Sequence, residues 1–133
     1  MVHEICIGEQ NGWYHDEGHT LGVFHTYDTF TLNGMTRKIH IYIPRSILSV
    51  INEDLNVSYP SLFVLDGQIA FFPEKDDQSL YISELLDKIG NNLNIIVVGI
   101  HASIDRDHEY LHEEVTEGIG GGLKELLPFI CDV

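Results

Sequence analysis

The chain has 133 residues, with 21 acidic and 7 basic side chains, a formal net charge of −14 and an apolar fraction of 44%. These values predict one globular domain, and the negative charge argues against nucleic-acid and anionic-membrane partners because it repels phosphate groups. The two cysteines, Cys6 and Cys131, show no metal-type spacing, and the N-terminus lacks the pattern of a signal peptide, so we expect a cytoplasmic protein.

The first third of the chain predicts a polar arm and an antiparallel hairpin. Residues 1–19 are mixed and polar, and we expect them to form a solvated N-terminal arm before a domain over residues 20–133. Residues 22–32 are rich in Phe, Tyr and Thr and alternate as a strand does. Asn33-Gly34 is a hairpin turn signal. Beyond it, the isoleucines of residues 37–43 share one face of a half-exposed strand, which Pro44 ends.

The rest of the chain predicts strands and helices in alternation. Residues 62–65 and 95–98 are continuous apolar runs, which are typical of parallel strands covered on both faces. Two amphipathic helices are predicted by apolar stripes at helical spacing. The stripes are Ile82, Leu85, Leu86 and Ile89, and then Leu123, Leu126, Leu127 and Ile130. The succession of hairpin, strand, helix, strand and helix predicts an α/β fold with an antiparallel edge.

Four segments, in this order and spacing, are similar to segments of a known family. They are Ile39–Pro44; Tyr59-Pro60 through Asp66-Gly67-Gln68; Val97–Ile100 with Arg106 and Glu109-Tyr110; and Gly120–Gly122 before Glu125–Ile130. Over residues 20–131 the chain resembles the putative-esterase branch of α/β-hydrolases, which includes enterochelin-type esterases and S-formylglutathione hydrolases. The resemblance implies a partial α/β-hydrolase fold. It departs from the family at His112, where members often have proline.

This resemblance implies serine-nucleophile hydrolysis of a small-molecule ester or thioester, without a cofactor. The family's nucleophile lies in a Gly-x-Ser-x-Gly elbow on the next strand, and no such motif occurs in these residues. We therefore expect the chain to be the N-terminal half of such a hydrolase, truncated before the nucleophile elbow and inactive alone. No catalytic residue is assigned within it. A non-catalytic remnant or interaction module is the alternative.

The resemblance also implies a role for the loop that follows residues 62–65. Acyl transfer builds negative charge on an oxygen, and backbone N–H groups are the usual donors that stabilise it. The position that matches the family's loop donor is Gln68, acting through its backbone, and Gly67 lets the chain turn tightly. An ordinary Asp-Gly turn is the alternative. Asp66, Ile69, Arg106 and Tyr110 are expected beside a substrate cleft; for Arg106 the alternative is a salt-bridged loop anchor among acidic neighbours.

His108-Glu109-Tyr110-Leu111-His112 matches the His-Glu-x-x-His motif of zinc hydrolases, in which two histidines one helical turn apart bind the metal. No histidine follows His112, and neither Glu117 nor Glu125 has the usual spacing of a third ligand. A zinc hydrolase is therefore a second alternative, and we expect no metal site here.

The strand order of the resembled family predicts a partner surface. It places residues 62–65 at the edge of the sheet, without a lysine or proline to protect that edge. An apolar edge is a template for pairing with another chain. We therefore expect self-association through this strand.

Overall fold

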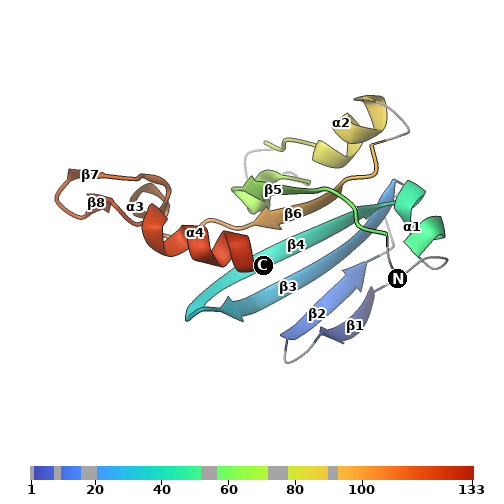
Figure 1. Ribbon diagram of the computed structural model, residues 1–133, viewed down its shortest axis with the longest axis horizontal. Helices are drawn as coiled ribbons and strands as arrows, with labels where there is room; N and C mark the ends of the chain where they lie inside the picture. Colours follow the sequence, from blue (N-terminus) through green and yellow to red (C-terminus); the bar gives the residue numbers. More distant parts are fainter. Residues whose placement is uncertain (1, 8–9, 16–20, 52–56, 72–77, 90–92) are drawn as a thin grey trace.

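The computed structural model describes residues 2–7, 10–15, 21–51, 57–71, 78–89 and 93–133 (Figure 1). Within them, the main element is a six-stranded sheet with the order β1-β2-β3-β4-β6-β5. Its strands are β1 (Val2–Ile7), β2 (Gln10–His15), β3 (Gly22–Leu32), β4 (Met35–Pro44), β5 (Ser61–Leu65) and β6 (Ile96–Ile100). The helices are α1 (Arg45–Ile51), α2 (Ile82–Ile89), α3 (Arg106–Tyr110) and α4 (Leu123–Asp132), with a 3-10 helix η1 (Gly67–Ile69) and a hairpin of β7 (Glu114–Thr116) and β8 (Ile119–Gly120).

The predicted hairpin and the α/β character are confirmed. Strands β3 and β4 pair antiparallel, and Asn33 and Gly34 between them have φ values of 52° and 77°, as a type I′ turn requires. Strand β6 then pairs antiparallel with β4 and parallel with β5. The sheet is therefore mixed, and its single parallel pair places the carboxyl ends of β5 and β6 side by side.

The N-terminal residues differ from the polar arm that the sequence predicts for residues 1–19. Strands β1 and β2 form a hairpin, and β2 pairs with β3 through Trp13, Tyr14 and His15. A Cβ at Gly12 would lie 2.5 Å from the ring of Tyr27, so the glycine lets this ring pack against the strand. Strands near a sheet edge need no continuous apolar run, so the polar sequence of this segment did not predict β1 and β2.

Helices cover both faces of the sheet (Figure 1). On one face, Ile82 and Leu86 of α2 pack with Phe24, Tyr42 and Val97. Strand β4, predicted to be half-exposed, is therefore covered on this face also.

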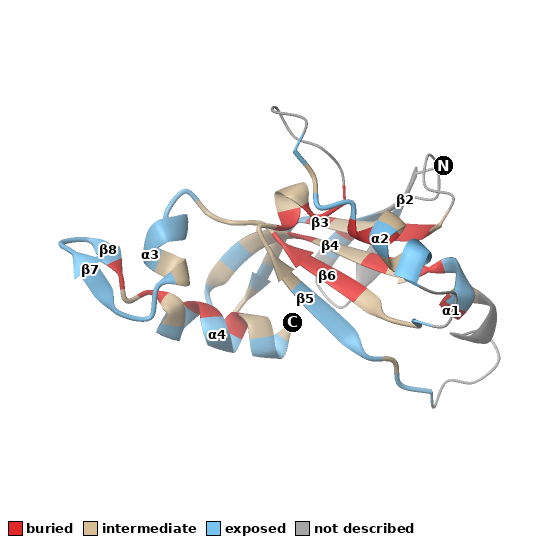
Figure 2. Cartoon of the chain, turned by 90° about the horizontal axis from the view of Figure 1, so that it is seen from above, coloured by how far each residue is buried: buried red, intermediate tan, exposed pale blue. Residues whose placement is uncertain are grey.

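On the other face, Phe129 and Ile130 of α4 pack with a second core cluster. Its other buried members are Tyr27, Ile39, Val98 and Ile100. Three of the eight residues in the predicted stripes are exposed instead, namely Leu85, Ile89 and Leu127. Figure 2 shows exposed surface along both α2 and α4.

Strand β5 lies at the edge of the sheet and, among the described residues, pairs with β6 alone. Leu62 and Phe63 on this strand are 41% and 40% exposed, so apolar side chains accompany the open edge. Of the helices that the structure describes, none is long and apolar enough to cross a membrane.

Candidate functional site

The loop after β5 begins with a sharp turn that packs on β6. Asp66 has φ 58° and ψ 44°, the left-handed conformation, and it precedes the short helix η1. Gly67 is buried, and a Cβ on it would lie 2.5 Å from the carbonyl carbon of Gly99 and 2.6 Å from the nitrogen of Ile100. Glycine is therefore required here for close approach of two backbones. The turn sits at the carboxyl ends of the parallel pair, where open α/β sheets bind ligands.

Gln68 lies in the first turn of η1, where helical N–H groups have no partner within the helix. The N–H groups of Ile69 and Ala70 donate to the carbonyls of Asp66 (3.0 Å) and Gly67 (3.3 Å), respectively. The Gln68 backbone N–H donates to no acceptor among the described residues. The Gly67 N–H likewise has no acceptor in the described part of the chain, so two successive backbone donors lie next to the carboxyl ends of β5 and β6.

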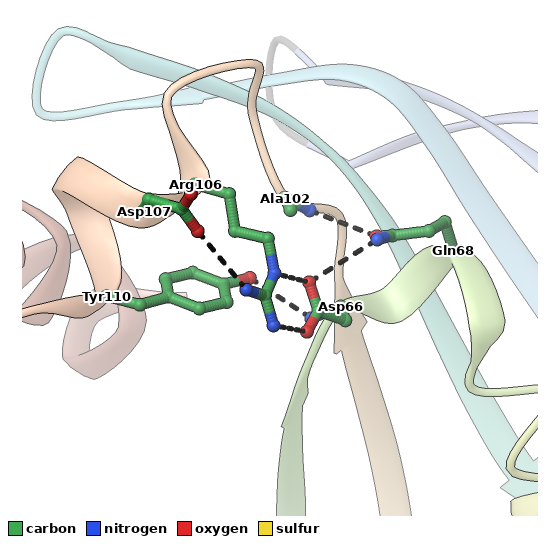
Figure 3. A network of polar contacts seen from close by, with 6 residues as sticks. All are labelled: Asp66, Gln68, Ala102, Arg106, Asp107 and Tyr110. Carbon is green, nitrogen blue, oxygen red and sulfur yellow. Dashed lines mark hydrogen bonds and ion pairs between the residues drawn. The ribbon is translucent and has the colours of Figure 1, made fainter.

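Arg106 and Tyr110 of α3 fix Asp66 from the opposite loop (Figure 3). Arg106 donates from Nε and Nη2 to the two carboxylate oxygens of Asp66, at 2.7 and 2.6 Å. The Asp66 backbone N–H donates to the Tyr110 hydroxyl at 3.1 Å, and the guanidinium lies 4.8 Å from the centre of the Tyr110 ring. Asp107 is 3.6 Å from the same guanidinium. Arg106 is therefore an anchor of the loop, joined mainly to Asp66.

These contacts shift the pKa values of Asp66, Arg106 and Tyr110. The hydrogen bond from Arg106 holds the pKa of the Asp66 carboxyl below its usual value, and its charge acts in the same direction. The same hydrogen bond raises the pKa of Arg106. Burial raises the pKa of the Tyr110 hydroxyl. Asp66 is therefore ionised and Tyr110 neutral at pH 7, so Asp66 and Arg106 form an ion pair at this pH.

The other predicted cleft residue, Ile69, has a structural role through its backbone. Its carbonyl accepts hydrogen bonds from the N–H of Leu80 at 2.7 Å and from Oγ of Ser79 at 3.0 Å. The loop after β5 is thus held on one side by the segment before α2 and on the other side by α3. The structure brings Asp66, Gly67, Gln68, Arg106 and Tyr110 together, and Ile69 adjoins them.

Three contacts in this region were not predicted from the sequence. The Ala102 backbone N–H donates to Oε1 of Gln68 at 3.1 Å. One residue earlier, His101 Nε2 lies 2.8 Å from His40 Nε2, and His40 Nδ1 lies 2.9 Å from the hydroxyl of Thr26. On β4, His40 alternates with the isoleucines that face the other side of the sheet. That alternation is the signal that places it on the α2 side.

The His-Glu-x-x-His segment lacks the geometry of a zinc site. Helix α3 ends at Tyr110 and Leu111 is extended, so His112 is not one helical turn from His108. Glu109 forms a largely buried ion pair with Arg37 of β4, and the His112 side chain is 82% exposed. The described residues include no group of three or more His, Cys, Asp or Glu side chains that could hold a metal ion. The zinc hydrolase alternative therefore has no support in this geometry.

Comparisons with known proteins reveal one informative likeness. No family model matches the chain, and no curated protein matches it significantly. Among solved structures, the chain is similar to an IroE-like serine hydrolase from Shewanella oneidensis, with a TM-score of 0.54 and 22% sequence identity. The match covers 73% of this chain and 31% of that structure. This likeness concerns the fold alone: a mixed sheet with helices, of α/β character, occurs in both proteins.

Proposed function

We propose that this chain forms the part of a serine ester or thioester hydrolase that supplies the oxyanion loop. The Gln68 backbone N–H is the loop's donor to the oxygen on which negative charge develops, and Gly67 lets the loop lie against β6. The serine nucleophile and its partners belong to residues outside these 133, because no Gly-x-Ser-x-Gly occurs among them. The substrate is a small-molecule ester or thioester, and the location is the cytoplasm.

The observation that carries this proposal is the state of the Gln68 backbone N–H. It has no acceptor among the described residues, although its loop is tied down on both sides by Arg106 and by Ser79. A fixed donor that has no acceptor in the described part of the chain fits a preorganised oxyanion site. The likeness of the fold to an IroE-like serine hydrolase supports the same assignment.

Probes for serine hydrolases test the proposal. The 133-residue chain is expected neither to turn over p-nitrophenyl acetate saturably nor to react with a fluorophosphonate. A longer product of the same gene that includes a nucleophile elbow is expected to do both. A label on a serine within residues 1–133 would contradict the placement of the nucleophile. Absence of reaction in every product of the gene would instead favour the non-catalytic interaction module.

A further inference from the structure

We infer that the side chain of Gln68 is a positioning group for its own backbone N–H. This inference rests on the proposed function for its importance to catalysis, but its geometry stands on the contacts alone. From the sequence alone, the Gln68 side chain is expected to have no role, because a backbone donor survives most substitutions. In the structure, however, this side chain connects the loop after β5 to the loop after β6 (Figure 3).

The side-chain amide of Gln68 makes one short and one long hydrogen bond. Oε1 of Gln68 accepts the Ala102 backbone N–H at 3.1 Å. Nε2 donates to Oδ1 of Asp66 at 3.4 Å, a longer contact that orients the amide more than it stabilises it. Ala102 lies two residues beyond β6, after the His101 N–H has made a bond to the Lys38 carbonyl at 3.0 Å. The Gln68 side chain thus satisfies a backbone donor that the sheet no longer pairs.

The peptide between Gly67 and Gln68 depends on this connection. On its first side, Gly67 has no side chain and is held by contact with the backbone of β6. On its second side, the carbonyl of this peptide accepts the Ala70 N–H at 3.3 Å, which orients the peptide relative to η1 but does not fix η1 against the loop after β6. The side chain of Gln68 links this residue to the backbone of Ala102 in that loop. It therefore helps to hold η1, and with it the Gln68 N–H, in place against the loop after β6.

Two substitutions remove the hydrogen bond in different ways. Gln68→Met keeps the length and removes the acceptor, and Gln68→Asn keeps the amide and shortens the reach. The measurements on the 133-residue chain are amide hydrogen exchange of Ala102 and the residual dipolar coupling of the Gln68 N–H. Neither requires hydrolase activity, so this test and the fluorophosphonate test fail independently.

We expect the Ala102 amide to exchange about fivefold faster in Gln68→Met and Gln68→Asn, the factor that one ordinary hydrogen bond contributes. The Gln68 coupling should change in both variants. Amides of β3 and β4 should exchange at their wild-type rates. Unchanged Ala102 exchange and Gln68 coupling in both variants would overturn the inference. It would also be overturned if protection fell throughout β3 and β4, since the side chain would then support the whole fold.

Discussion

Replacing Gly67 with alanine would place a methyl carbon inside the backbone of β6. The new Cβ would lie 2.5 Å from the carbonyl carbon of Gly99, 2.6 Å from the nitrogen of Ile100 and 2.8 Å from its carbonyl carbon, whereas ordinary contact begins at 3.4 Å. The loop must therefore retreat by about 1 Å, because strand β6 is fixed between β4 and β5. Gly67 is not among the glycines with positive φ, so lack of space is the cause rather than backbone conformation.

Overpacking of this kind costs about 1–3 kcal/mol of unfolding free energy. With a urea dependence of about 2 kcal/mol per molar for a protein of this size, we expect the midpoint to fall by about 1 M. Circular dichroism measures it, at one protein concentration because association would shift the midpoint.

The matched control for this prediction is Gly34→Asn. A Cβ at Gly34 meets nothing within 4 Å, and its φ of 77° is one that asparagine tolerates. This variant should lose about 0.5 kcal/mol or less. A Gly67→Ala protein as stable as the wild type would refute the close approach of the loop to β6, and with it the reason for glycine in the proposed oxyanion loop.

Three further predictions concern the edge strand, the ion pair and the histidine motif. The wild-type chain should self-associate through β5 in 0.15 M salt, where charge repulsion is screened beyond about 8 Å, and Phe63→Lys should be monomeric by light scattering; a monomeric wild type would contradict this. Because Arg106 lowers the folded pKa of Asp66, this pair stabilises the fold above the unfolded pKa of about 3.9, and its contribution is lost as pH falls through the lower folded value. Asp66→Asn should therefore be less stable than the wild type in urea at pH 7, with a difference that shrinks toward pH 2; a constant difference would mean that the pair does not titrate. Elemental analysis after dialysis should find no stoichiometric zinc, and one zinc per chain that disappears when His108 and His112 become alanine would revive the metal site.

The apolar runs predicted the positions of strands β5 and β6, and the Asn33-Gly34 turn adopts the positive φ values that these residues favour. The expected burial on both faces holds for β6, whereas Leu62 and Phe63 of β5 are 41% and 40% exposed because β5 lies at the sheet edge. Strands β1 and β2 escaped prediction because strands near an edge need no apolar run. The apolar stripes of α2 and α4 overstated burial: Leu85 and Leu127 match the helical period but remain about half exposed. The apolar periodicity of a helix predicts which of its faces can be buried. In the described structure, the sheet covers only part of that face on α2 and α4.

The candidate site was predictable in position and not in its contacts. The Asp-Gly pair after an apolar run indicated a turn at the carboxyl end of a strand. The partner of Gln68 is the backbone N–H of Ala102. Every residue except proline has such a group, so the residue type at this position does not predict the contact. The His-Glu-x-x-His motif misled for a related reason. It indicates metal binding if its helix continues, and here the helix ends at Tyr110.

The parallel pairing of β5 with β6 explains why these contacts occur together. Three interactions join the same two loops: Asp66 with Arg106, Asp66 with Tyr110, and Gln68 with Ala102. Each follows from the register in which Leu65 lies opposite Ile100, since both loops then leave the sheet at the same level. A slip of one residue would move one loop along the other by about 3.3 Å, more than a hydrogen bond can absorb. All three contacts would fail at once, so the register of this strand pair, more than any single side chain, determines whether the proposed oxyanion loop is preorganised.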